Sequence, residues 1–75
     1  MAGLNLQQLT NEAEKRVHRG ERKIAHQREI ISILERDGLN ATAAKRLLKF
    51  LERAQANDVV DHDRLSSRAA AMEIA

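Results

Sequence analysis

The chain has 75 residues and a formal net charge of +2, from 13 Lys and Arg against 11 Asp and Glu, with no Pro, Cys, Trp or Tyr and a single Phe. This length supports one small domain, and the absence of cysteine excludes disulfides and thiolate metal sites. Because the composition is poor in aromatic residues and rich in Ala, Leu, Ile, Glu, Lys and Arg, we expect an all-α protein.

The first predicted element is a helix over residues 6–36, after a flexible start at 1–5 in which Asn5 is a candidate N-cap. Apolar and small residues recur here at alternating spacings of four and three, the heptad pattern of a helix that packs against another helix. We call the residues that face the partner helix the seam. On this helix they are Thr10, Ala13, Val17, Gly20, Ile24, Gln27, Ile31 and Leu34. A glycine in the seam predicts that a bulky group from the facing helix sits over it.

A turn over residues 37–40 follows. Gly38 suits the position after the helix C-cap, where the backbone needs a positive φ. We expect Leu39 to fold back onto Leu34 in a Schellman cap, and Asn40 to cap a second helix by accepting from the backbone N–H of Ala43.

The second predicted helix covers residues 41–70, which makes 6–70 a single helical-hairpin domain with a frayed C-terminus at 71–75. Its seam contains Ala44, Leu48, Leu51, Gln55, Asp58, His62, Leu65, Ala69 and Met72.

A short turn makes the two helices antiparallel, so the register can be predicted. We expect Ile24 to face Gln55 and Gln27 to face Leu51. Three flanking pairs then have opposite charges, namely Glu35 with Lys45, Arg28 with Glu52, and Arg16 with Asp61. Exposed ion pairs of this kind select a register more than they add stability.

Four apolar residues near the turn flank the seam and are not covered by a two-helix hairpin. They are Ile30, Ile33, Leu47 and Phe50, which we call the apolar face. Burying such side chains stabilises by roughly 1.5–3 kcal/mol each, whereas so small a domain rarely gains more than about 3–5 kcal/mol from its own core. We therefore expect two hairpins to pair through the apolar face into a two-fold symmetric, antiparallel four-helix bundle.

The histidines are the first candidates for chemistry. The predicted register brings His18 near Asp58 and His62, but no His-x-x-x-His or Glu-x-x-His pair is present. We expect His18 and His26 to be solvated and His62 to pack in the seam, with no metal bound. A role for His26 in phosphate transfer lacks any supporting motif around it.

The densest basic cluster, which we call the basic strip, contains Lys15, Arg16, Arg19, Arg22 and Lys23. It suggests nucleic-acid binding. Against this, we expect Asp58, Asp61 and Asp63 to neutralise the strip, and Glu29, Glu35 and Asp37 to approach the cations from Lys45 to Arg53. A helix-turn-helix spacing and aromatic residues for base stacking are also missing.

Neither a nucleophile–base pair, nor a Gly-rich phosphate loop, nor a pair of inward carboxylates is present, so we expect no enzymatic activity and no cofactor or small-molecule substrate. Gln27 and Gln55 are interpreted as seam amides that fix the register. No signal sequence or membrane-spanning run is found in the sequence, which predicts a cytoplasmic protein without membrane contact.

The chain contains the motifs Gly20-Glu21-Arg22, Ile24-Ala25, Gln27-Arg28, Leu34-Glu35-Arg36-Asp37-Gly38 and Asp63-Arg64-Leu65. In these motifs it resembles a group of short uncharacterised bacterial proteins found in rhizobia and their relatives. The resemblance covers about residues 16–65. It implies a bare two-helix architecture and a bacterial cytosol, and it carries no active site. This chain departs from the group at Leu39, where the group has a polar residue, and at Asp58, where it has a histidine.

These patterns predict a non-enzymatic interaction protein that self-associates and binds another protein through its remaining surfaces. The alternative is a nucleic-acid-associated regulator that uses the basic strip.

Overall fold

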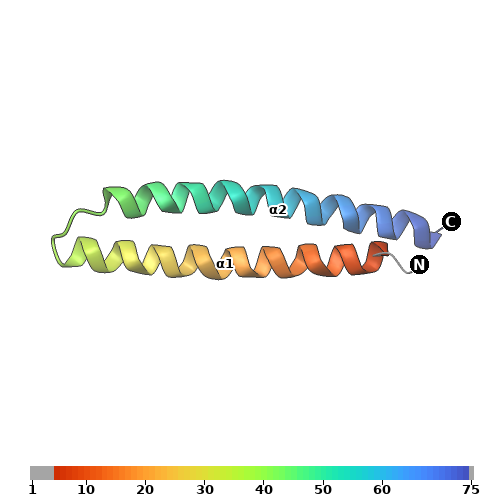
Figure 1. Cartoon of the computed structure of the whole chain (residues 1–75), viewed down its shortest axis with the longest axis horizontal. Coiled ribbons are helices and arrows are strands. Elements are labelled where there is room, and N and C mark those ends of the chain that lie inside the picture. The colour runs from red at the N-terminus through yellow and green to blue at the C-terminus, as the bar shows by residue number, and fades with distance from the viewer. Residues whose placement is uncertain (1–4, 75) are drawn as a thin grey trace.

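The computed structural model describes residues 5–74, and the side chains of 5–72. Two helices, α1 (Leu6–Arg36) and α2 (Thr42–Ile74), lie side by side and antiparallel in a rod of 58 × 22 × 14 Å (Figure 1). Within the described residues all regular structure is helical, which confirms the all-α hairpin. The expectations for residues 1–4 and 75 lie outside the described residues.

Helix α1 begins with a capping box. Asn5 is the N-cap, and its side chain accepts from the backbone N–H of Gln8 at 2.8 Å. In return, the Gln8 side-chain oxygen accepts from the backbone N–H of Asn5 at 3.0 Å. Two N–H groups that a helix start leaves without partners are thereby satisfied, so the chain enters α1 at a defined residue.

Helix α1 ends in the predicted Schellman cap. Asp37 is the C-cap and Gly38 has φ 71°, the one positive φ among the described residues. The N–H of Leu39 donates to the carbonyl of Leu34 at 2.8 Å, and the N–H of Gly38 donates to that of Glu35 at 3.1 Å. The two bonds satisfy carbonyls at the helix end and reverse the chain.

The start of α2 differs from the prediction. The Asn40 side chain accepts from the N–H of Thr42 at 2.9 Å, not from Ala43. The helix accordingly begins at Thr42, one residue later than expected, and the carbonyl of Ala41 accepts its first helical bond, from Lys45, at 2.9 Å. At the other end, α2 continues to Ile74 instead of ending near 70. The run Ala69–Ala71 explains this extension, because alanine is the strongest helix former.

This longer connection shifts the register by about one helical turn. Residues 39–41 are not helical and run back beside the end of α1 (Figure 1). An extended residue advances about 3.3 Å against 1.5 Å in a helix, so these residues take up axial length that α2 was expected to fill. Gln55 consequently lies against Gly20 and not against Ile24. Likewise Gln27 reaches Ala44, so its predicted position opposite Leu51 is wrong.

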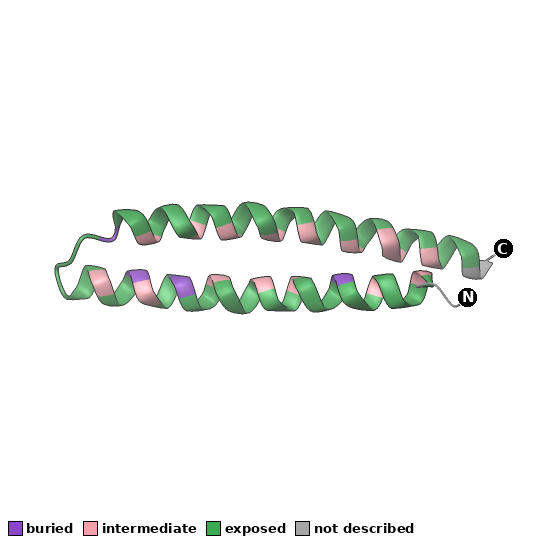
Figure 2. Ribbon diagram, in the orientation of Figure 1, coloured by how far each residue is buried: buried purple, intermediate pink, exposed green. Residues whose placement is uncertain are grey.

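Burial follows one narrow line along the facing sides of the helices (Figure 2). The apolar residues classed as buried in the described part of the chain are Ala13, Ile31 and Ala41. Gln27, a polar residue, is buried to the same degree, with 6% of its surface exposed. The other predicted seam residues are half-buried, except Met72, which is exposed. The hairpin therefore has a contact line rather than an enclosed core.

Because the cap at Gly38 requires a positive φ, we expect Gly38→Ala to lower the free energy of unfolding by about 1 kcal/mol. Steric crowding does not contribute to this loss of stability, since an added Cβ at Gly38 would meet nothing within 4 Å. Gly38→Asn should cost less, because asparagine tolerates this conformation better. Urea unfolding followed by circular dichroism at one fixed protein concentration measures both. Equal stability of all three proteins would refute the role given to this cap.

Candidate interaction surfaces

The apolar face is open to water. Its exposed fractions are 42% for Ile33, 46% for Leu47 and 67% for Phe50, whereas Ile30 is half-buried. Residues three apart lie on the same side of a helix, so Ile30 and Ile33 on α1, and Leu47 and Phe50 on α2, form two short stripes beside the seam. They give one apolar patch at the turn end of the rod.

Two glutamine side chains cross the seam. Gln27 Nε2 donates to the carbonyl oxygen of Ala44 at 2.9 Å, and Gln55 Nε2 donates to that of Val17 at 3.0 Å. Each bond joins a side chain of one helix to the backbone of the other. Because a buried amide without a partner costs about 1–3 kcal/mol, sliding one helix along the other is penalised at both positions.

Gly20 makes room for the second of these glutamines. A Cβ on Gly20 would overlap Gln55 Oε1, so the glutamine is the bulky group that the seam glycine predicted. Gln55 Oε1 is buried and has no conventional hydrogen-bond partner among the described residues. The Gly20 Hα that takes the place of the Cβ points at this oxygen, and a Cα–H···O contact therefore provides part of the missing hydrogen bonding.

Two of the three predicted ion pairs form. Glu35 Oε2 lies 3.1 Å from Lys45 Nζ, and Glu52 Oε2 lies 3.4 Å from Arg28 Nη2. The third prediction is wrong, since Arg16 Nε lies 3.9 Å from Asp58 Oδ1 and forms no pair with Asp61. The register shift explains why Arg16 pairs with Asp58 instead of Asp61, because Asp58 is about one turn nearer the start of α2.

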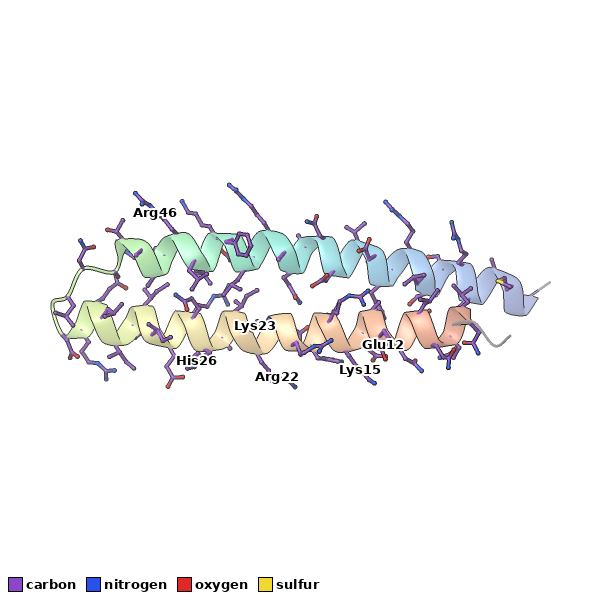
Figure 3. All side chains as sticks on the ribbon, viewed as in Figure 1. Glu12, Lys15, Arg22, Lys23, His26 and Arg46 are labelled. Carbon is purple, nitrogen blue, oxygen red and sulfur yellow. The ribbon has the colours of Figure 1, made fainter. Side chains whose placement is uncertain are left out.

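The basic strip keeps more free charge than the sequence indicated. Lys15 pairs with Glu12 at 3.5 Å and Arg16 with Asp58, but no carboxylate in the described residues lies within 4 Å of Arg19, Arg22 or Lys23. The expected neutralisation of the strip by three aspartates is therefore wrong. In Figure 3, Lys15 and Arg22 point outward from α1, whereas Lys23 lies on the side of α1 nearer to α2.

The cations of α2 also keep more free charge than we expected from the sequence. Of these, Lys45 forms its predicted pair, whereas within the described residues no ion pair involves Arg46, Lys49 or Arg53. Figure 3 shows Arg46 pointing away from α1 on the outer edge of α2.

The histidines do not converge. His18 lies on the surface between Glu14 and Glu21 of its own helix, at 3.7 and 3.6 Å, and His26 is exposed. His62 is half-buried, with Nδ1 3.5 Å from Asp63 Oδ1. Over the residues that the structure describes, no three His, Cys, Asp or Glu side chains are grouped so as to hold a metal ion, so the considered cluster of His18, Asp58 and His62 does not form.

A groove that the sequence reasoning missed runs beside the seam. One hollow, of about 370 Å³, is lined by Arg16, Arg19 and Lys23 from α1 and by Phe50, Leu51 and Ala54 from α2, among others. A second hollow, of about 350 Å³, shares Arg16 and continues towards the far end of the rod along Asp61, Arg64, Leu65 and Arg68. The sequence pattern indicates the position of this groove, because Arg16, Arg19 and Lys23 lie on the same side of α1 as Ile30 and Ile33.

Comparison with known proteins adds no assignment. Scans of protein-family models, curated proteins and solved structures each return no match for this chain. The resemblance to short two-helix bacterial proteins stays a prediction from the motifs. Between residues 5 and 74, neither helix contains a stretch long and apolar enough to cross a bilayer.

The contact between Gly20 and Gln55 predicts a measurable coupling. Gly20→Ala gains about 1 kcal/mol of helix propensity, but it displaces the Gln55 amide from Val17, which costs about 0.5–1.5 kcal/mol. The substitution should therefore be nearly neutral in the unmodified chain and stabilising by about 1 kcal/mol in a Gln55→Ala background. Urea unfolding of the four proteins in this cycle measures the difference. The same effect of Gly20→Ala in both backgrounds would contradict the proposed contact.

Proposed function

We propose that this protein is a non-enzymatic interaction protein that self-associates through its apolar face. The observation that carries the proposal is the mismatch between a thin interior and an exposed apolar patch. The interior offers two alanines, one isoleucine and a glutamine, whereas Ile33, Leu47 and Phe50 lie in water. A domain of this size that lacks a disulfide needs a further source of stability, and a second copy of the chain provides one.

The surface area supports the same conclusion. The hairpin exposes 5940 Å², whereas a compact monomer of its mass exposes about 4,700 Å². The excess is larger than the roughly 800 Å² that each partner buries in an interface of standard size. A dimer interface of that size would therefore bring the exposed area per chain closer to that of a compact protein.

Charge favours one orientation of the two hairpins. If both rods pointed the same way, the cations of each groove would face their own copies across the interface, and like charges in contact cost free energy. With the rods pointing in opposite directions and only the turn ends overlapping, the apolar faces meet and the grooves stay apart. This arrangement is a two-fold symmetric, antiparallel four-helix bundle limited to the turn half of the rod.

The alternative is a nucleic-acid-associated regulator that uses the basic strip. The free charges of Arg19, Arg22 and Lys23 favour it more than the sequence did. The lack of a helix-turn-helix spacing, and of any aromatic residue other than Phe50 for base stacking, opposes it. We therefore rank it second.

Replacing two exposed residues of the apolar face tests the proposal. We expect Ile33→Glu combined with Leu47→Glu to reduce the mass in sedimentation equilibrium from about twice 8.5 kDa to 8.5 kDa, because burying two unpaired carboxylates opposes association. Helicity at the same protein concentration should fall as well, since the isolated hairpin has little core.

Val60→Glu is the matched control. Val60 is 50% exposed, much like the two test residues, but it lies on the outer side of α2 away from the apolar face. It should leave the mass unchanged. A double variant with the mass and melting curve of the unmodified protein, or dissociation by the control alone, would contradict the proposed interface.

A further inference from the structure

The groove beside the apolar face consists of two successive hollows, and Arg16 lines both of them. It extends along α2 from Phe50 to Arg68, which corresponds to about 27 Å of helix. Along this length the hairpin presents a trough between two antiparallel helices.

The lining of the groove is strongly cationic. Arg16, Arg19 and Lys23 line the groove from α1, and Arg64 and Arg68 line it from α2. Only Asp58 and Asp61 oppose these five cations, and Arg16 is the one cation of the set that has an ion pair in the described structure. An occupant that carries carboxylates would gain ion pairs that the hairpin itself does not form.

The groove also has an apolar component. Leu51 and Leu65 are half-buried along its floor, and Phe50, 67% exposed, stands at the end next to the apolar face. A nucleic acid would meet the cations but leave these side chains in contact with phosphate and sugar. A small molecule would stay largely exposed, whereas bound ligands bury most of their surface.

We propose that this groove binds an acidic amphipathic helix of another protein, which lies along α1 and α2 as a third helix. Apolar residues at spacings of three and four on such a helix would cover Leu51 and Leu65, as in other helix-in-groove complexes. Carboxylates on its flanks would meet Arg19 and Lys23 on one side and Arg64 and Arg68 on the other. A second copy docking through the same surface would place five cations against five.

All residues that line the groove belong to one chain, so this proposal does not rest on self-association. It also requires no part of the apolar face apart from Phe50, which stands at the boundary between the two surfaces. In the antiparallel dimer proposed above, only the turn ends overlap, so each groove extends beyond the shared interface and stays accessible. The dimer would accordingly present two equivalent docking grooves.

The test uses a synthetic peptide of about 18 residues, long enough to follow the groove as a helix. Its leucines stand at helical spacings of three and four and its remaining positions are mainly glutamate. A scrambled peptide of the same composition is the first control. Fluorescence anisotropy at about 0.15 M salt measures binding, so that weak surface attraction is screened. We expect saturable binding of the patterned peptide and at least about tenfold weaker binding of the scrambled one.

Charge reversal locates the binding. Arg19→Glu combined with Lys23→Glu should weaken binding by at least about tenfold. Arg46→Glu combined with Arg53→Glu changes the net charge by the same amount at free cations outside the groove, and it should weaken binding by less than about threefold. Arg19→Gln with Lys23→Gln, a milder pair that preserves helix propensity, should lie between the two. Circular dichroism checks that every variant has the helicity of the unmodified protein.

Several results would overturn the proposal. They are the absence of saturable binding, equal binding of the scrambled peptide, an equal loss with the outer charge reversal, and tighter binding of a single-stranded oligonucleotide or of anionic lipid vesicles than of the patterned peptide. The oligonucleotide result would support the basic strip as a nucleic-acid site instead.

Discussion

Two helices share a single line of contact, and the properties of this hairpin follow from that constraint. Among the described residues only Ala13, Ile31, Ala41 and Gln27 are buried, and the sides of both helices lie in water. Larger helical domains cover such sides with a third and fourth helix. In this chain the apolar face and the cationic groove lie on one uncovered side, at successive positions along the rod. The narrow contact thus leaves two surfaces of the hairpin uncovered, and we propose that each binds a partner.

Polar contacts specify how the helices align. Gln27 and Gln55 each bond to a backbone carbonyl of the other helix, and Gly20 provides the space that Gln55 needs. Buried amides add little net stability, but a shift of register leaves them without partners. Apolar residues at these positions would tolerate several alignments. We interpret the glutamines as fixing one alignment, which in turn fixes which cations line the groove.

Local features were predictable from the sequence, whereas the register was not. Asn5 and Gly38 cap α1 because their own side chain or backbone freedom determines the cap, so the residues alone suffice. The register depended on Asn40, whose side chain accepts from Thr42 and lengthens the connection. That one local difference moved Gln55 from Ile24 to Gly20 and replaced Asp61 with Asp58 beside Arg16. Arg28 and Glu52 still paired, because long side chains reach across a one-turn shift. The groove was missed because its free cations could be identified only once the register was known.

The central claim is that the hairpin needs a second copy to complete its fold. The most direct measurement is the thermal unfolding of the unmodified protein, followed by circular dichroism over about a thousandfold range of protein concentration. If association through the apolar face stabilises the folded chain, the midpoint of unfolding will rise steadily with concentration, and sedimentation equilibrium at the upper end will give a dimer. A sharp transition with the same midpoint at every concentration, together with a monomeric mass throughout, would contradict the account.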